Sequence, residues 1–542
     1  MSLLSITVTA LRNIVARGRC STCVASQRLL STDNHATGDD SGPLYDVVIS
    51  GGGMVGCAMA CALGHEALFE GKKILLLEAA PDKGELKLLP TYANRVCALS
   101  PASTALLDSF GAWEHIVGMR AQPVKRMQVW ESCSDSMITF NKDNMQGTLA
   151  HIVENDVTQD AITRQLNKVK DRVEIRYETK VKKYKMPKPM SNMTKLDSPW
   201  VKLRLENGDA LQTRLLIGAD GFRSLVRESC NIHSMSWDYN QRAIVCTLQL
   251  PTQTENNVAW QRFTPTGPIA ILPLDDEHSS LVWSTTPEDA KHLLALPNDS
   301  FVDALNDALW ENSQKDSTAV YAGQLLDQLI RSISPAGTST AGRQLPPHIT
   351  GVDDNRGAFP LGLCHATNYV KSGVALIGDA AHRIHPLAGQ GVNLGFGDVA
   401  CLKNILTQAV KDGADLGSIL HLSDYERQRQ RQIIPVMATV DGLNRLYRNK
   451  MSPLVLLRSL GLQTTNALNP LKAHLDSAGK VLEDPNTFLQ RNGPDISGDL
   501  SSGLTIHMIL QVCTEVDLDS QAKLLITLTH TSTDMSYWSQ RH

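Results

Sequence analysis

Residues 45–56 read Tyr-Asp-Val-Val-Ile-Ser-Gly-Gly-Gly-Met-Val-Gly, an apolar run that leads into three consecutive glycines. Small and apolar residues continue to Leu63, and a second apolar run, Lys73–Leu77, ends at Glu78. A buried strand, a closely packed helix and a second strand ending in an acid are typical of a dinucleotide-binding βαβ unit. This stretch therefore predicts a parallel α/β sheet with a phosphate-binding turn after its first strand.

Gly51, Gly53 and Gly56 have the spacing of the dinucleotide fingerprint. The first glycine permits a tight turn, the second lets the backbone approach a pyrophosphate, and the third lets the helix pack on the strand. The helix start offers free N–H groups to phosphate, and Glu78 can accept hydrogen bonds from ribose hydroxyls. Taken alone, this segment leaves NAD, FAD and a glycine turn without any ligand as alternatives.

Two later segments also carry glycines directly after apolar runs. Residues 215–221 read Leu-Leu-Ile-Gly-Ala-Asp-Gly, and residues 375–393 read Ala-Leu-Ile-Gly-Asp-Ala-Ala-His-Arg-Ile-His-Pro-Leu-Ala-Gly-Gln-Gly-Val-Asn. A domain that binds only NAD has no use for either, so the three segments together favour a discontinuous FAD site. Asp379 can accept hydrogen bonds from the ribityl chain, and a helix starting within 389–393 would stabilise the negative charge of reduced flavin.

Length and composition fit a protein of several domains. The chain has 542 residues and a net charge of −4, which gives no reason to expect nucleic acid as a partner. Before Asp33 the chain contains arginines but no acid, so residues 1–42 match a mitochondrial transit peptide, with a disordered basic tail as the alternative. The eleven cysteines are scattered, which favours free thiols in a reducing compartment.

The order of these patterns predicts an α/β fold. It consists of a discontinuous Rossmann-like FAD-binding domain, an inserted antiparallel β-sheet substrate domain and a C-terminal helical region. Asn207-Gly208 marks a hairpin, and the alternating residues from about 240 to 290 predict the antiparallel sheet. The predicted boundaries are 1–42 for the transit peptide, 43–125, 148–230 and 366–410 for the FAD-binding domain, 231–365 for the substrate domain, 411–480 for the helical region, and 481–542 for a tail without an assigned role.

Apolar and aromatic residues of the second sheet are candidates for the wall of a dry reaction pocket, because water competes with oxygen transfer. The candidates are Trp260, Phe263, Ile269, Ile271, Leu272 and Trp283, together with Pro386 from the third glycine segment. Each residue of the second sheet, taken singly, fits the sheet's own core at least as well.

His382 and His385 lie three residues apart, which resembles metal-ligand spacing. No cysteine or carboxylate completes a ligand set around them, so we expect no metal site and predict packing or polar contacts instead. The charged run Arg427–Arg431 is expected to face solvent on a helix. The sequence nominates no general base.

The chain resembles the flavin aromatic hydroxylases, the group that includes para-hydroxybenzoate hydroxylase, and most closely their mitochondrial ubiquinone-biosynthesis branch. The resemblance covers about residues 44 to 475 and leaves out the tail. Besides the glycine segments and residues 378–386, it is carried by Tyr92–Val96, His151–Asp156, Ala259–Phe263 and Gly267–Leu274.

The resemblance implies a set of FAD-binding residues. Gly51, Gly53, Gly56 and Glu78 would bind the ADP half, Arg95 would lie near the pyrophosphate or the ring, and Asn155 beside the ribityl chain. Asp220 and Gly221 would line the groove, Asp379 would hold the ribityl and phosphate side, and Pro386, Gly389, Gln390, Gly391 and Asn393 would contact the isoalloxazine.

The resemblance also implies a reaction and partners. The expected reaction uses molecular oxygen, through a flavin hydroperoxide, to hydroxylate the ring of a polyprenylated 4-hydroxybenzoate or phenol beside its hydroxyl. Electrons would come from NADPH through ferredoxin reductase and ferredoxin. The enzyme would work within a ubiquinone-biosynthesis complex, attached peripherally to the matrix side of the inner membrane. The apolar segment Pro453–Leu462 fits membrane-surface contact and a core helix equally well.

Two other functions remain open at this point. One is a prenyl-lipid carrier that uses the FAD fold without redox chemistry. The other is an FAD-dependent epoxidase or reductase of isoprenoids.

Overall fold

The computed structural model describes residues 42–134, 136–141, 147–187, 199–251, 255–310, 315–317, 320–325, 346–456 and 458–459. All of them belong to one compact unit, Ser41–His542. The predicted transit peptide, apart from Gly42, and the tail 481–542 lie outside the described residues. Of Pro453–Leu462, residues 453–456 and 458–459 are described, and Val455 is buried against Cys133, as in the core-helix alternative. No helix within the described ranges is long and apolar enough to cross a membrane.

The first sheet is built mainly from parallel strands, as the apolar runs predict. Its order is β18-β19-β11-β1-β2-β8, and β10 and β9 extend it from β11 as an antiparallel pair. The bounds are β1 Leu44–Ser50, β2 Ile74–Leu77, β8 Val173–Arg176, β9 Val181–Lys185, β10 Val201–Leu205, β11 Ala210–Gly218, β18 Val370–Lys371 and β19 Val374–Leu376. Val47, Val48 and Ile49 have no exposed surface, as expected for a parallel sheet covered on both faces.

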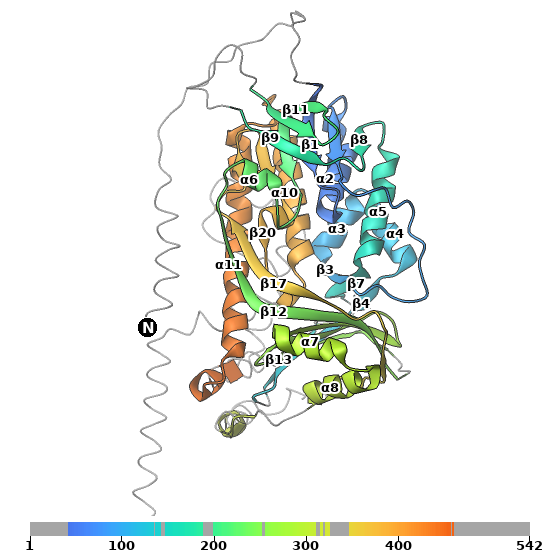
Figure 1. Cartoon of the computed structure of the whole chain (residues 1–542), viewed down its shortest axis with the longest axis vertical. Coiled ribbons are helices and arrows are strands. Elements are labelled where there is room, and N and C mark those ends of the chain that lie inside the picture. The colour runs from blue at the N-terminus through green and yellow to red at the C-terminus, as the bar shows by residue number, and fades with distance from the viewer. Residues whose placement is uncertain are drawn as a thin grey trace, which may run out of the picture. The chain divides into compact units, whose positions relative to one another are not determined.

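Helices cover this sheet and connect its strands (Figure 1). α2 (Met54–His65) packs against α5 (Asn155–Lys168) and α10 (Gly391–Lys411), and its small residues allow this close contact. α11 (Ile419–Arg448) packs against α10 and carries an internal proline, Pro435. Other elements of this part are η1 (Ala67–Phe69), α3 (Pro101–Ser109), α4 (Ala112–Met119), α6 (Leu225–Ser229), η3 (Gly378–Ala380) and η4 (Pro386–Ala388).

The second sheet has the order β20-β17-β12-β15-β14-β13-β5-β6, and β16 pairs with β12. Its bounds are β5 Arg126–Glu131, β6 Met137–Asn141, β12 Ser234–Gln249, β13 Val258–Thr264, β14 Gly267–Pro273, β15 His278–Thr285, β16 Gly351–Val352, β17 Gly357–Ala366 and β20 His382–Arg383. The antiparallel pairing of β12 to β15 confirms the sheet predicted from residues 240–290. The sheet also recruits β5, which pairs with β13 in parallel and which the alternation pattern did not predict.

The two faces of the second sheet have different surroundings. One face packs in a buried cluster with α7 (Pro287–Ala295) and α8 (Asn298–Trp310), which lie beside the sheet in Figure 1. The other face meets a small sheet formed by β3 (Val96–Leu99), β4 (Gln122–Val124) and β7 (Ala150–Glu154). This second contact brings the substrate-domain candidates close to residues of the FAD-binding segments.

Candidate cofactor-binding site

The three glycine segments follow three neighbouring strands and meet at one edge of the first sheet. β1 lies beside β11 and β11 beside β19, all in parallel, with Ser50 opposite Gly218 and Gly218 opposite Leu376. The Ala219 amide donates to the Ser50 carbonyl at 2.8 Å, and the Ile377 amide donates to the Gly218 carbonyl at 3.0 Å. Ligands of open α/β sheets bind outside the carboxyl ends of the strands, which is where these segments lie.

The first glycine turn has no room for side chains at two positions. A Cβ on Gly51 would lie 2.4 Å from the Ala219 carbonyl oxygen, and the φ of Gly51 is +109°. A Cβ on Gly56 would lie 1.9 Å from the Gly51 carbonyl oxygen. At Gly53, which precedes α2, a Cβ would meet nothing within 4 Å. The turn is therefore tight where helix meets strand and open at the helix N-terminus.

Glu78 lies directly after β2, at the position expected for the acid of a dinucleotide-binding unit. Its carboxylate accepts hydrogen bonds from the amides of Gly52 and, at 2.7 Å, Ala80. These bonds fix the carboxylate against the glycine turn, and its remaining lone pairs are available to a ribose hydroxyl.

The second segment leaves a carboxylate oxygen without a partner. Asp220 accepts a hydrogen bond from the Val226 amide at 3.1 Å through Oδ2, whereas Oδ1 is buried and unpaired among the described residues. Burial raises the pKa of this carboxyl, although several hydrogen bonds oppose the shift. Gly221 has a φ of +78° and open space around it. The Arg227 guanidinium donates to the Ala380 carbonyl at 2.7 Å and so ties this segment to the third.

Asp379 lies in the third segment, in the short helix η3 (Gly378–Ala380) that follows β19. Its side chain is exposed to solvent, yet desolvation by the surrounding protein raises the pKa of its carboxyl, against the effect of His382 and Arg383. Because the carboxylate is both exposed and surrounded by protein, it can accept hydrogen bonds from a ligand bound beside the third segment.

Arg95 and Asn155 are brought together although 60 residues separate them in the chain. The Asn155 amide donates to the Arg95 carbonyl at 2.9 Å, next to the β3–β7 pairing. The Oδ1 of Asn155 is buried without a partner in the described part of the chain. The Arg95 guanidinium is exposed and lies 5.9 Å from the ring centre of Phe359. An amide oxygen and an arginine are thus both presented at the edge of the site.

The start of α10 combines open backbone with a fixed side chain. Pro386 lies in η4 (Pro386–Ala388), Gly389 has a φ of +61°, Gln390 precedes the helix, and a Cβ on Gly391 would meet nothing within 4 Å. Asn393 faces inward. Its Oδ1 accepts from the Ser100 amide at 3.0 Å and the Ser103 hydroxyl at 2.6 Å, and its Nδ2 donates to the Ala98 carbonyl at 2.8 Å. The Asn393 side chain therefore fastens α10 to β3 and α3, and only its backbone is free to face a ligand.

A buried ion cluster between α10 and α11 anchors the third glycine segment. Asp398 on α10 accepts hydrogen bonds from the Gly378 amide at 2.8 Å, from His382 Nε2 at 2.7 Å and from Arg429 Nε at 2.6 Å. The expectation that Arg427–Arg431 faces solvent is wrong for Arg429, which is buried and turned toward Asp398. Burial alone would raise the pKa of Asp398, but His382 and Arg429 together hold it below its usual value.

The sequence contained one signal for this cluster, a single acid within the small and apolar start of the helix 391–411. His382 makes a polar contact, as predicted. His385 has no hydrogen-bond partner on either ring nitrogen among the described residues, and burial lowers its pKa to about 3. Within the described ranges, no group of three metal-ligating side chains is found.

The wall candidates divide between the two faces of the second sheet. Trp260, Ile269, Ile271 and Trp283 belong to the cluster that packs with α7 and α8. Phe263 stacks on Tyr447 of α11 with 3.9 Å between ring centres. Leu272 lies on the opposite face in the junction cluster, formed by Tyr92, Val96, Ala98, Val124, Met127, Leu149, Ile152, Ala259, Leu272 and Leu274. A Cβ on Gly389 would lie 3.6 Å from Ala98, so the third segment adjoins this cluster.

The residues present fit a flavin nucleotide. Gly53, Gly221 and Gly391 leave open space where side chains would otherwise stand, and Asn155 and Asp220 hold unpaired buried oxygens. The N-termini of α2 and α10 open at the same edge of the sheet and suit phosphate and an anionic ring.

Comparisons with known proteins agree with this fit. The family described as an FAD binding domain matches residues 44–321 and 350–438. The mitochondrial ubiquinone biosynthesis monooxygenase COQ6 of Xenopus tropicalis is 52% identical over 450 residues, which cover 83% of this chain and 96% of that protein. The protein of the same name from Homo sapiens is 52% identical over 440 residues, which cover 81% and 93% of the two chains.

A solved structure shows the same fold. The crystal structure of pqsL, a probable FAD-dependent monooxygenase from Pseudomonas aeruginosa, superposes with a TM-score of 0.55 at 20% identity. The match covers 77% of this chain and 99% of the pqsL chain.

Proposed function

We propose a specific reaction from one premise: this chain belongs to the family of FAD-dependent mitochondrial ubiquinone biosynthesis monooxygenases. The proposed reaction is hydroxylation of the aromatic ring of a polyprenylated 4-hydroxybenzoate or phenol, at the position beside the phenol hydroxyl. The comparisons give no support to a prenyl-lipid carrier or to an epoxidase or reductase of isoprenoids.

The observation that carries the proposal is the meeting of three glycine segments after β1, β11 and β19. In this proposal Gly51, Gly53, Gly56 and Glu78 bind the ADP half of FAD, and Arg95 lies near the pyrophosphate or the ring. Asn155 lies beside the ribityl chain, Asp220 and Gly221 line the groove, and Asp379 holds the ribityl and phosphate side. The isoalloxazine faces Pro386, Gly389, Gln390, Gly391 and the backbone of Asn393. FAD, when bound and reduced, supplies the activation of molecular oxygen, which protein side chains cannot supply.

The chain's own contribution is to orient the substrate ring and to exclude water. We infer that the ring lies against the junction cluster, since this cluster adjoins Gly389 and several of its side chains are only partly buried. Leu272 and Pro386 are then the wall candidates that face the ring. Trp260 supports the sheet from its other face. Apolar walls exclude water from the reacting atoms, and a fixed ring orientation selects the position that is hydroxylated.

We further propose that electrons reach the enzyme from NADPH through ferredoxin reductase and ferredoxin. We also propose that it works within the ubiquinone-biosynthesis complex, on the matrix side of the inner membrane as a peripheral protein. The support is the resemblance of residues 44 to 475 to the mitochondrial branch, together with the apolar character expected of a polyprenylated substrate.

The test is a reaction with purified protein, FAD, oxygen and a prenylated 4-hydroxybenzoate, with electrons supplied once by ferredoxin and its reductase and once by a chemical reductant. We expect a catechol product by mass spectrometry with either electron source. Hydrogen peroxide without ring product from both sources would contradict the proposed reaction. A product from the chemical reductant alone would remove only the ferredoxin proposal.

A further inference from the structure

The segment before Arg95 has no secondary structure of its own. Residues 78–95 connect β2 to β3 without a helix or strand, and Leu88 and Leu89 within them are exposed. A connection of this length keeps one conformation only when side-chain contacts hold it. The contacts that hold its last residues therefore decide where Arg95 lies.

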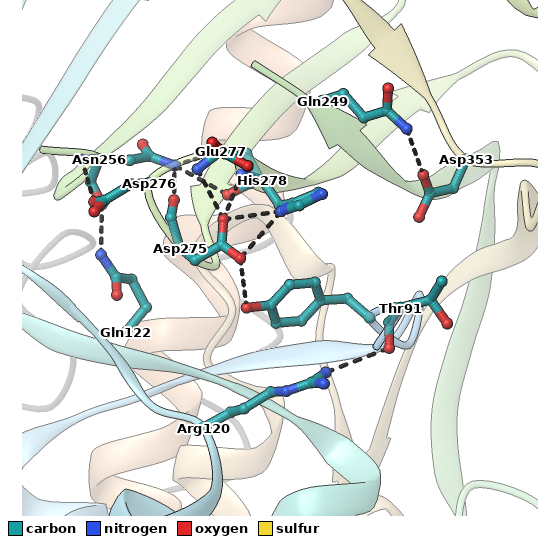
Figure 2. A network of polar contacts seen from close by, with 12 residues as sticks. Thr91, Arg120, Gln122, Gln249, Asn256, Asp275, Asp276, Glu277, His278 and Asp353 are labelled. Atoms are coloured by element: carbon teal, nitrogen blue, oxygen red, sulfur yellow. Dashed lines mark hydrogen bonds and ion pairs between the residues drawn. The ribbon is translucent and has the colours of Figure 1, made fainter. Parts of the chain in front are cut away.

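One set of contacts comes from the side of the FAD-binding segments. The Ala93 amide donates to Glu154 at 2.7 Å, and Arg120 pairs with the same carboxylate at 3.3 Å. Arg120 also donates to the Thr91 carbonyl at 3.3 Å, as Figure 2 shows, and lies over the ring of Tyr92 at 4.5 Å from its centre.

A second set comes from the second sheet. The Tyr92 hydroxyl donates to Asp275 Oδ2 at 2.8 Å, across 183 positions of the chain. Asn355 Nδ2, from the loop before β17, donates to the Tyr92 carbonyl at 3.3 Å. The segment is thus held from both sides at the residues immediately before Arg95.

Asp275 is a preorganised acceptor. It lies in the turn between β14 and β15, where its Oδ1 accepts from the amides of Glu277 at 2.8 Å and His278 at 2.6 Å. His278 Nδ1 lies 2.9 Å from the same oxygen, and Asn256 donates to the Asp275 carbonyl at 2.8 Å, as the polar network of Figure 2 shows. Contacts within its own turn therefore fix the Asp275 carboxylate independently of Tyr92. Burial, reinforced by the bond to Asp275, raises the pKa of Tyr92, so the phenol keeps the proton that it donates.

We propose that Tyr92 is a positioning residue for the cofactor, because its hydrogen bond to Asp275 lets the second sheet hold Arg95 where FAD meets it. Three residues of extended chain span at most about 11 Å, so a shift at Tyr92 is passed directly to Arg95. The proposal rests on the proposed role of Arg95 at the flavin nucleotide. It makes a turn of the substrate sheet a determinant of FAD affinity.

The test is titration of the apoprotein with FAD, followed by flavin fluorescence. Tyr92→Phe removes only the hydroxyl and keeps the ring beneath Arg120. We expect it to raise the FAD dissociation constant about fivefold or more, since hydrogen bonds to charged groups are among the stronger ones. Asp275→Asn, which changes the other partner, should act in the same direction. Tyr321→Phe is the matched control, because Tyr321 is 65% exposed, and it should leave FAD affinity unchanged.

A double-mutant cycle separates positioning from general loosening of the fold. If Tyr92 acts through Arg95, Tyr92→Phe should weaken FAD binding in the wild-type background and have little further effect in Arg95→Met. An equal loss in both backgrounds, or wild-type affinity in both Tyr92→Phe and Asp275→Asn, would overturn the proposal. Should Tyr92→Phe fail to fold, the same cycle with Asp275→Asn decides. A wild-type apoprotein that binds no FAD would remove the proposed function as well.

Discussion

Replacing Asp398 by asparagine tests the buried ion cluster behind the third glycine segment. The substitution leaves Arg429 and His382 without their carboxylate, and it weakens the acceptor of the Gly378 amide. Removing one partner of a buried ion pair costs about 3–5 kcal/mol, because the remaining charge stays buried without compensation. We expect a loss of that size in the free energy of unfolding, and weaker FAD binding because Gly378 precedes Asp379.

Urea unfolding of the apoprotein, followed by circular dichroism, measures this loss without the stabilisation that bound FAD adds. Asp424→Asn on α11 is the matched control. Its ion pair with Arg427 has a similar distance, 2.7 Å, but is exposed, so its loss should cost less than about 1 kcal/mol. If Asp398→Asn destabilised the protein no more than Asp424→Asn does, the assigned role of the cluster would be refuted.

Three further predictions concern the same region. Burial lowers the pKa of His385 to about 3 and that of His365 to about 4, so unfolding takes up protons below about pH 6.5 and stability falls as the pH drops. Each histidine should lower the free energy of unfolding by about 2 kcal/mol near pH 5. A urea unfolding midpoint that does not change with pH would contradict this. Gly53→Ala should leave apoprotein stability within about 0.5 kcal/mol of wild type. It should raise the FAD dissociation constant at least tenfold, because its Cβ would occupy the space proposed for the pyrophosphate. Gly56→Val should instead disrupt the turn itself. Apoprotein unfolding and FAD titration distinguish the two, and unaltered FAD affinity in Gly53→Ala would count against the assigned turn. Trp260→Ala should lower the free energy of unfolding in urea by about 3–5 kcal/mol. It should change FAD affinity little, because Trp260 packs on the face of the sheet away from the junction cluster. A loss of FAD affinity without a loss of stability would contradict that assignment.

Local sequence signals were enough to predict the cofactor half of the fold. Buried parallel strands read as continuous apolar runs. Glycines follow them where a Cβ would collide with the neighbouring segment, as at Gly51, or with the turn's own backbone, as at Gly56. The hairpin at Asn207-Gly208 is likewise a local turn preference, and β10 and β11 confirm it. In each case a few adjacent residues carry the physical cause.

What the sequence did not disclose depends on contacts between distant residues. Arg429 reads as part of a charged helical run, and only Asp398, 31 positions earlier, explains why it turns inward. Tyr92 and Asp275 are 183 positions apart, and nothing near either residue indicates the bond. In the second sheet both faces are buried, so alternation alone could not assign Trp260 to one face and Leu272 to the other.

The most direct test of the central claim is to purify the full chain, together with Asp379→Leu and Gly391→Leu, and to quantify bound FAD from its visible absorbance. We predict a yellow wild-type protein with FAD close to equimolar, and two variants that have lost most of the pigment and all ring hydroxylation. Pigment and hydroxylation preserved in both variants would contradict it.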